Sequence, residues 1–552
     1  MNRDKELRKN IRYDVKGVAL LHNPLLNKGT AFSYQERSLL DLEGLLPPHI
    51  STQAEQKMKV LSTVRSLDTD MAKYIYLMSL QDRNETLFYR LIIDEIEEFM
   101  PIIYTPTVGQ ACQEYGHIFR RPRGMYISNN DKGCIKKILK NWPRKDVDVI
   151  VVTDGQRILG LGDLGADGMG IPVGKLSLYT VCAGINPRKT IPITIDVGTN
   201  NEELLEDPLY IGLRHKRITG DEYDELIDEF MDAVSETFPN VLIQFEDFAN
   251  QNASRLLEKY RHNYCTFNDD IQGTGSVILA GLFTAMKNLE SSLSEQRVLF
   301  YGAGSAAIGI AQDIACAKEM AGTPSQEAKE NIFLFDSRGL VVKGRNHLTP
   351  NKEQFAHSIA GETNFLEVVK KVKPTVIIGV AGQPNVFTKA VIEVLIQEND
   401  HPIIFALSNP TAKSECTAED AYRWSKGKAI FASGSPFNPV EFEGKTFYPG
   451  QGNNAYIFPG LGLGTVISRS SRVVDEMLII AAQTLGNMVS QSDFDEGRLY
   501  PPLTNIREIS IKIATAIAEY AFDHQLAQVS RPENIEQTIR EEAYQPDYIS
   551  YV

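Results

Sequence analysis

Short apolar runs alternate with helix-like stretches from about residue 147 to residue 433, and this alternation limits the possible fold more than any other feature. The runs lie at residues 147–152, 191–197, 241–245, 264–267, 297–301, 332–335, 375–380, 402–407 and 429–433. Near-continuous apolar strands are typical of parallel sheets that are covered on both faces. The pattern therefore predicts a doubly wound α/β architecture, with the first four runs in one sheet and the last five in a second.

The two ends of the chain show a helical pattern instead. Apolar side chains recur at three- and four-residue spacing in residues 38–50, 54–67 and 71–100. The same spacing returns at 472–489 and 507–522. Leu46 followed by Pro47 and Pro48 predicts a break between two of the N-terminal helices.

Charge and cysteine content exclude several classes of protein. The 552 residues include 57 Lys and Arg against 71 Asp and Glu, a net charge of −14, whereas nucleic-acid binders are usually basic. Six widely spaced cysteines without a C-x-x-C pair favour a reducing compartment. No apolar run approaches the roughly 20 residues that span a bilayer, and MNRDKELRKN does not resemble a secretory signal. We therefore expect a cytoplasmic enzyme or binding protein, with no nucleic-acid or membrane partner.

Polar residues directly follow most of the apolar runs. In a parallel sheet, ligands bind outside the carboxyl ends of the strands, so these residues are expected at one edge, where the chemistry should take place. They are Thr153–Gly155, Glu246–Asp247, Asn268–Asp270, Gly302–Gly304, Asp336, Gly382 and Ser408–Pro410.

A glycine-rich turn follows the run at 297–301. It has the pattern GxGxxA and precedes a helix-like stretch, so it predicts a nucleotide site in which the glycines allow close approach of a pyrophosphate and the helix N-terminus stabilises its charge. The alternative is that the glycines serve only helix–strand packing. The expected cofactor-binding residues are Gly302, Gly304, Ser305, Ala306 and Ala307.

Asp336 ends the next run, 336 − 302 = 34 residues after Gly302. A carboxylate at this point would accept a hydrogen bond from a ribose 2′-hydroxyl and favour NAD. Neighbouring polar and basic residues could instead bind a 2′-phosphate and favour NADP. These are Ser337, Arg338, Lys343, Arg345 and Lys352. The sequence leaves NAD and NADP both open.

Two carboxylate pairs, Glu246–Asp247 and Asp269–Asp270, each follow a short predicted strand. Taken alone, such residues are more often helix caps or solvated groups, and the second pair could simply cap the helix that follows it. Two pairs at one sheet edge beside a nucleotide site favour a cation that neutralises them. All-oxygen ligands are typical of Mg²⁺ or Mn²⁺ rather than zinc.

Long blocks of the sequence, in order and nearly end to end, resemble the malic enzyme family. The blocks are YTPTVGQAC (104–112), FRRPRGMYIS (119–128), VTDGQRILGLGDLGADGMGIPVGKLSLYT (152–180), IDVGTNN (195–201), QFEDF (244–248), FNDDIQGTG (267–275), YGAGSAA (301–307), ALSNPT (406–411) and PGQGNNAYIFPG (449–460). The resemblance implies oxidative decarboxylation of (S)-malate to pyruvate and CO₂, with reduction of NAD or NADP, a bound divalent metal and a homotetramer built from two dimers.

The resemblance also implies roles for individual residues. Glu246, Asp247 and Asp270 match the metal ligands, and Tyr104 and Lys175 match the acid–base pair. Arg157, Asn409 and Asn453 match substrate-binding residues, and Arg157, Asp270 and Asn409 also match cofactor contacts. Some relatives are activated by fumarate through a glutamate and two arginines. Only Arg83 matches here, because Ser51 and Lys59 occupy the other positions, so this route is not expected.

The chemistry assigns different tasks to Lys175 and Tyr104. Lys175 is expected to remove the hydroxyl proton of malate, but a free lysine has a pKa near 10.4, so burial and a nearby positive charge would have to lower it. Tyr104 is already protonated at neutral pH and is suited to protonate C3 of the enol form of pyruvate.

We expect three domains and a tail. The helical N-terminal domain covers residues 1–120, and a parallel α/β catalytic and metal-binding domain covers 121–273, completed by 459–530. A Rossmann-like NAD(P)-binding domain covers 274–458, and the tail is 531–552. The tail could dock on a neighbouring subunit or stay mobile.

Two other functions remain as alternatives. In malolactic conversion NAD is retained and lactate released; such sequences resemble TDSEGILGIGDWG at 153–165, whereas this chain has Arg157 there. The other alternative, a regulatory protein with an inactive site, requires the loss of a catalytic residue, and none is lost. The sequence favours a malic enzyme.

Overall fold

The computed structural model describes residues 15–552, which pack as two compact units. The first unit takes in the chain up to Ala249 together with Pro532–Val552, and the second is Asn250–Arg531. Within the described part of the chain, no helix is both long and apolar enough to cross a membrane.

The first unit begins with a group of short helices, as the apolar spacing predicts. They are α2 (Gly17–Leu21), α3 (Tyr34–Leu39), α4 (Gln53–Arg65), α5 (Asp70–Arg83), α6 (Glu85–Asp94), α7 (Ile96–Ile103), α8 (Thr107–Gln113) and α9 (Tyr115–Ile118). The predicted break at Pro47 and Pro48 lies between α3 and α4. The single pattern over 71–100 is interrupted at Asn84, whose side chain accepts a hydrogen bond from the Leu87 amide and so starts α6 as a new helix.

The sheet of this unit contains β1 (Met125–Ser128), β2 (Val149–Thr153), β3 (Thr190–Asp196) and β4 (Leu242–Phe245), in the parallel order β1-β3-β2-β4. The helices among them are α10 (Ile135–Leu139), α11 (Gly170–Ala183), α12 (Glu202–Glu206) and α13 (Asp221–Thr237). The sequence analysis missed β1. This strand is half-buried and short, so it lacks the continuous apolar run of the central strands.

The C-terminal residues pack on the N-terminal helices of the same chain. After α26 (Ile535–Glu542), the Tyr544 amide donates to Gly184 O at 2.6 Å. Tyr548 Oη donates to Gln56 Oε1 at 2.6 Å, and the Tyr551 amide donates to Glu36 Oε1 at 2.8 Å. The tail is thus anchored within the first unit, a placement that the sequence analysis did not specify.

The second unit contains a seven-stranded sheet of order β14-β11-β10-β9-β6-β7-β8, parallel except for the β7–β8 pair. Its strands are β6 (Val298–Tyr301), β7 (Ile332–Asp336), β8 (Gly339–Leu340), β9 (Val376–Gly379), β10 (Ile403–Ala406), β11 (Ile430–Ser433) and β14 (Gly450–Gln451). A separate hairpin pairs β12 (Val440–Phe442) with β13 (Lys445–Phe447). The chain starts in the middle, at β6, and adds strands first on one side and then on the other, as doubly wound sheets do.

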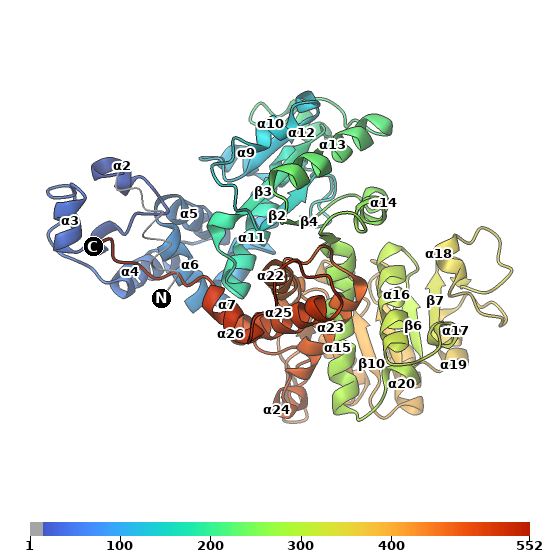
Figure 1. The fold of residues 1–552 in the computed structure, drawn as a ribbon. Coiled ribbons are helices and arrows are strands. Elements are labelled where there is room, and N and C mark those ends of the chain that lie inside the picture. Colours follow the sequence, from blue (N-terminus) through green and yellow to red (C-terminus); the bar gives the residue numbers. More distant parts are fainter. Residues whose placement is uncertain (1–14) are drawn as a thin grey trace. The chain divides into compact units, whose positions relative to one another are not determined.

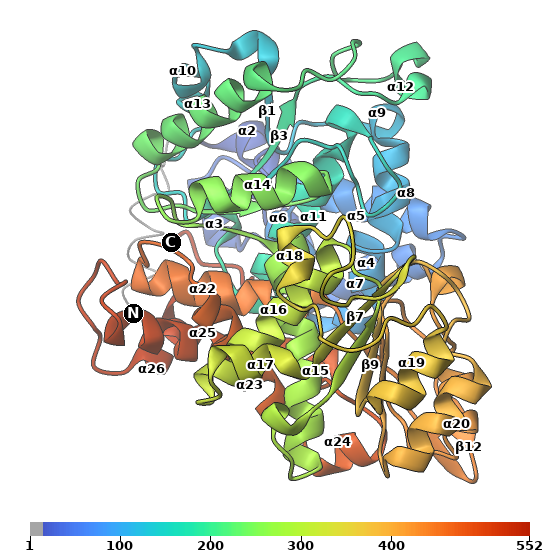
Figure 2. The ribbon, with the colours of Figure 1, turned by 90° about the vertical axis from the view of Figure 1, so that its right-hand side faces the viewer.

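Helices cover both faces of this sheet (Figure 2). In Figure 2, α16 (Ser305–Met320) and α17 (Ser325–Glu330) lie to the left of β7 and β9, and α19 (Phe365–Val372) and α20 (Lys389–Glu398) lie to the right. The remaining helices of this part of the unit are α14 (Asn250–Tyr260), α15 (Thr274–Asn288), α18 (Pro350–Glu353) and α21 (Ala418–Trp424). Side chains of α19, α20 and α21 form one buried core with β6, β9, β10 and β11.

The predicted fold class is confirmed. All nine apolar runs contain or overlap a strand: the first three lie in the sheet of the first unit, the fourth overlaps β5 (Thr266–Asn268), and the last five lie in the seven-stranded sheet of the second unit. The predicted use of 459–530 to complete the catalytic domain stays a prediction. These residues form α22 (Phe458–Ser468), α23 (Asp475–Asn487), α24 (Gln491–Asp495) and α25 (Ile506–Asp523). They belong to the second unit, because α23 packs on α15 and α25 packs on α22 and α23 (Figure 1).

Candidate active site

Lys175 and Glu246 form a buried ion pair in the first unit. Glu246 directly follows β4, and Lys175 lies in α11, every residue of which is buried. Lys175 Nζ lies 2.9 Å from Glu246 Oε1, and both side chains are 2% exposed. A lysine that acts as a base was expected to be buried and to lie near a positive charge. Lys175 is buried, but the group paired with it is a carboxylate rather than a cation. An adjacent carboxylate favours the charged ammonium form.

Gln244 and Tyr179 extend this pair into a chain of buried hydrogen bonds. Tyr179 Oη donates to Gln244 Oε1 at 2.6 Å, and Gln244 Nε2 donates to Glu246 Oε2 at 2.7 Å. Both oxygens of Glu246 therefore have a fixed partner, which orients the carboxylate. The sequence analysis missed both residues. The available signals were a polar Gln inside the apolar run VLIQF, and a Tyr four residues after Lys175, on the same helix face.

Tyr104 follows α7 and packs against Lys175. The ammonium of Lys175 lies 5.4 Å from the centre of the Tyr104 ring. Gly174 leaves room for this approach, because a Cβ there would lie only 3.0 Å from Cδ2 of Tyr104. Burial raises the pKa of Tyr104 well above its ordinary value, and the opposing effect of Lys175 is smaller. The phenol is therefore protonated at neutral pH, the state that its expected role requires.

A second glycine-rich segment, around Gly160–Gly165, forms a loop, and this loop contacts Asp247. The Arg157 amide donates to Asp247 O and the Leu159 amide donates to Asp247 Oδ1, each at 3.2 Å. Asp247 has a φ of +56°, a left-handed conformation that is uncommon outside glycine. Such strain at a predicted ligand indicates that the surrounding contacts fix its position.

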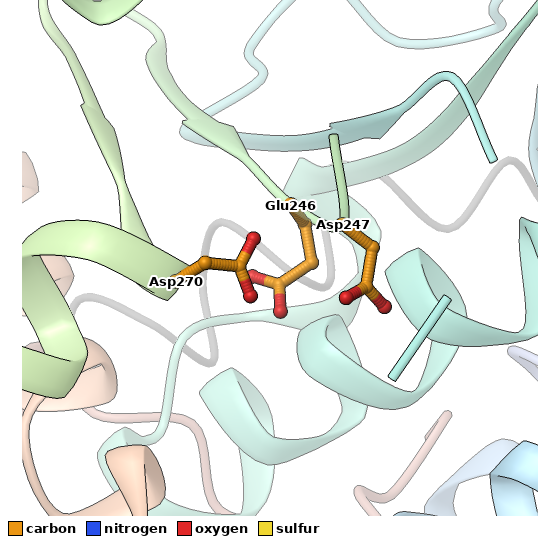
Figure 3. Close-up of side chains that lie close together, drawn as sticks. All are labelled: Glu246, Asp247 and Asp270. Carbon is orange, nitrogen blue, oxygen red and sulfur yellow. The ribbon is translucent and has the colours of Figure 1, made fainter. Parts of the chain in front are cut away.

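Glu246, Asp247 and Asp270 are drawn in Figure 3. Each offers a carboxylate oxygen that could bind a metal ion; Glu246 and Asp247 belong to the first unit and Asp270 to the second. Asp270 belongs to a π-helical turn, Asp269–Gly273, which precedes α15. The turn is capped by Asn268, whose side chain accepts from the Ile271 amide.

The nucleotide motif of the second unit has the expected strand–turn–helix form. β6 ends at Tyr301, and Gly302 follows with a φ of +123°. A Cβ at Gly302 would lie 3.2 Å from the Val380 backbone, so the turn needs glycine. A Cβ at Gly304 would meet nothing within 4 Å, and Ser305 and Ala306, which start α16, are exposed, whereas Ala307 is buried. The helix N-terminus is thus open to a ligand.

Asp336 ends β7 and is surrounded by hydrogen-bond donors. Its Oδ2 accepts from Arg345 and, at 3.0 Å, from Lys352, and its Oδ1 accepts from the Arg338 amide. Burial alone would raise the pKa of Asp336, but the hydrogen bonds from Arg345, Arg338 and Lys352 outweigh it and lower that pKa. A carboxylate and two cations therefore lie together where the sequence analysis placed the ribose of the cofactor.

Asn409 and Asn453 lie in loops that follow β10 and β14 of the second sheet. Asn409 is exposed, and its Oδ1 accepts from Ser435 Oγ. Asn453 Oδ1 accepts from the Ala455 amide at 3.0 Å. In both residues these contacts orient the side-chain amide.

Comparisons with known proteins agree with these features. Residues 81–261 match the family model described as malic enzyme, N-terminal domain, and residues 271–522 match the malic enzyme, NAD binding domain. The chain is 53% identical over 540 residues to the NADP-dependent malic enzyme of Columba livia, covering 97% of each sequence. It is 52% identical over 536 residues to that of Homo sapiens, covering 97% of this chain and 94% of the relative.

Solved structures of lower identity agree in fold. The crystal structure of the Entamoeba histolytica malic enzyme gives a TM-score of 0.56 at 22% identity, covering 92% of this chain and 91% of that one. The malic enzyme of Pyrococcus horikoshii gives 0.54 at 24% identity, with coverages of 81% and 89%. The matched family models span most of the chain, and the relatives are more than half identical over nearly all of it. The chain belongs to the malic enzyme family.

Proposed function

We propose that this protein oxidises (S)-malate and decarboxylates it to pyruvate and CO₂ while reducing NADP. The observation that carries this proposal is the buried group of Lys175, Glu246 and Tyr104, with the loop of Arg157 fixed on Asp247 beside it. Family membership supports the same activity.

The residues present fit a divalent metal. Glu246, Asp247 and Asp270 offer three carboxylate oxygens, and an all-oxygen donor set is suited to Mg²⁺ or Mn²⁺. These three residues would bind the metal. When bound, the metal supplies Lewis-acid polarisation of the malate C2 oxygen, and the nucleotide accepts hydride from C2.

The chain's own residues would bind malate and move its protons. Arg157 offers a planar guanidinium that can bind a carboxylate of malate through two charge-assisted hydrogen bonds. Lys175 would accept the proton of the C2 hydroxyl. Its pairing with Glu246 opposes this role in the protein alone, whereas a cation on Glu246 would offset that negative charge. Tyr104, buried and protonated, would donate its proton to C3 after CO₂ leaves.

The basic residues around Asp336 support NADP rather than NAD. A 2′-phosphate carries negative charge that Lys352 and Arg345 can pair with, and the named relatives are NADP-dependent. We expect Lys352→Gln to raise KM for NADP at least about tenfold, because a charge-assisted hydrogen bond is worth roughly 1.5–3 kcal/mol.

The measurement for this prediction is steady-state kinetics with each cofactor at saturating malate. KM for NAD should change by less than about twofold, and Lys370→Gln, which removes an exposed lysine of the same unit paired with Glu367, should change neither. Equal weakening of NAD and NADP by Lys352→Gln would contradict the phosphate contact.

The reaction itself is tested by its products. With (S)-malate, NADP and Mn²⁺, the purified protein should form pyruvate and NADPH in equal amounts, measured by absorbance of the reduced cofactor and chromatography of the acids. Arg157 is the residue that separates this reaction from malolactic conversion. Lactate formed without net cofactor reduction would assign the protein to the malolactic reaction instead.

A homotetramer and a cytoplasmic location stay predictions from the sequence. The first is checked by light scattering of the purified protein, and the second by fractionation of cells that express it.

A further inference from the structure

We propose that Arg217 is a positioning residue for malate binding: its buried guanidinium closes the base of the loop 154–163 and thereby fixes Arg157 and the loop amides that contact Asp247. The inference rests on the proposed function only for the role of Arg157. The closure itself is a property of the first unit.

Arg217 binds both ends of the loop at once. Nε and Nη2 donate to Oδ2 and Oδ1 of Asp163 at 2.7 and 2.8 Å, a two-pronged pair. Nη2 also donates to the backbone oxygen of Asp154 at 2.8 Å, and Nη1 lies 3.8 Å from Asp154 Oδ2. The side chain of Arg217 is only 2% exposed. One guanidinium therefore joins the residue that starts the loop to a residue nine positions later.

Hydrogen bonds from three further groups fix the orientation of the Asp163 carboxylate. Its Oδ1 also accepts from the Gly165 amide and from Thr199 Oγ1, and its Oδ2 accepts from the Asn200 amide. Asp163 thus receives five hydrogen bonds on two oxygens when the two from Arg217 are included. Because the carboxylate is held from several sides, Arg217 is held in one geometry as well.

The other end of the loop is equally fixed. Asp154 is fully buried, and its Oδ2 accepts from Tyr223 Oη at 2.7 Å. Gly155 O accepts from the Leu164 and Gly165 amides at 2.9 and 3.2 Å. A Cβ at Gly155 would lie 2.0 Å from Gly165 O, so the two chain segments at the base of the loop are in direct contact at this point. The loop has a narrow, buried base.

The rest of the loop has few anchors of its own. The Ile158 amide donates to Gly162 O, and the Arg157 and Leu159 amides donate to Asp247, but Leu161 at the tip is 48% exposed. The closed base and the amide contacts to Asp247 together locate the loop that contains Arg157. Loss of Arg217 should therefore displace Arg157 while the sheet below it stays folded.

The test compares Arg217→Ala with Arg214→Ala, which removes an exposed guanidinium three residues away that donates to Pro208 O. For Arg217→Ala we expect KM for malate to rise at least tenfold while KM for NADP stays within twofold. Hydrogen exchange should accelerate at least tenfold in residues 155–163 and remain unchanged in α11 and β3. Arg217→Lys should behave like Arg217→Ala, because one ammonium cannot bind Asp163 at two points and also reach Asp154 O. Arg214→Ala should match the wild type.

Three results would overturn the proposal. The first is unchanged hydrogen exchange in residues 155–163 of Arg217→Ala. The second is faster hydrogen exchange throughout the first unit together with an unchanged KM for malate. The third is wild-type loop exchange and wild-type KM for malate in Arg217→Lys. Should Arg217→Ala not fold, Asp163→Asn gives the same test, since it removes the charged partner with little change in shape, and it should raise loop exchange and KM for malate in the same way. Absence of pyruvate formation by the wild type would contradict the proposed function, whereas the exchange experiment would still decide whether Arg217 closes the loop.

Discussion

Replacing Lys175 with alanine is expected to lower kcat for malate oxidation by about a thousandfold, equivalent to about 4 kcal/mol of activation free energy. The reason is that Lys175 is the buried base candidate beside Tyr104, and it contacts Glu246, a predicted metal ligand. Steady-state turnover with NADP and Mn²⁺ measures the effect. Thermal unfolding measured in parallel reports how far the loss of the buried ion pair destabilises the fold.

A second buried lysine provides the matched control. Lys318 in α16 is 1% exposed, donates to Gln296 O, and has a pKa lowered to about 8 by burial. Lys318→Met removes a buried ammonium remote in sequence from the predicted acid–base pair and should leave kcat within about threefold. A comparable loss in both variants would show that any buried lysine has this effect and would remove the special role of Lys175.

The sheets were predictable because their residues leave little choice. A run such as 147–152 must be covered on both faces, and its strand, β2, is buried at every position. By contrast, β1 has alternating buried and half-buried residues over four positions, too short for its pattern to be distinguished from a loop. Strand prediction thus succeeded where burial was complete and failed at the half-buried strand β1.

Helix boundaries and domain membership depended on contacts that no local pattern contains. The pattern over 71–100 does not reveal that Asn84 caps a new helix, and the amphipathic stretches after residue 459 do not state which surface they cover. The structure packs α23 on α15, so the segment follows the second unit. Amphipathic spacing identifies a buried face but not its partner.

In the candidate active site, too, some residues could be predicted from the sequence and others could not. Residues with charged side chains at strand ends, such as Glu246, Asp247 and Asp336, were identified from chemistry and position. Gln244, Tyr179 and Arg217 were missed because their importance lies in hydrogen bonds to residues distant in sequence. Such bonds join positions up to 65 residues apart, as between Tyr179 and Gln244. Supporting contacts of this kind can be recognised only when the fold is known.

The second large loss of activity is expected when the metal site is altered or the metal is removed. Asp270→Ala should weaken Mn²⁺ binding at least about a hundredfold, since even loss of a residue that only supports a ligand typically costs 10–100-fold in affinity. Turnover at a fixed Mn²⁺ concentration should fall by about a thousandfold or more. Binding is followed by electron paramagnetic resonance of free Mn²⁺, which does not depend on activity. Wild-type protein treated with a chelator should lose activity and regain it with Mn²⁺ or Mg²⁺.

The control is Asp495→Ala, which removes an exposed carboxylate of the same unit that accepts a hydrogen bond from Gln491. It should bind Mn²⁺ as the wild type does, because a single solvated carboxylate does not form a metal site. Full turnover by chelated wild-type protein would contradict the metal assignment altogether. Normal Mn²⁺ binding by Asp270→Ala would contradict only the assignment of Asp270. Glu246 and Asp247 would remain as predicted ligands.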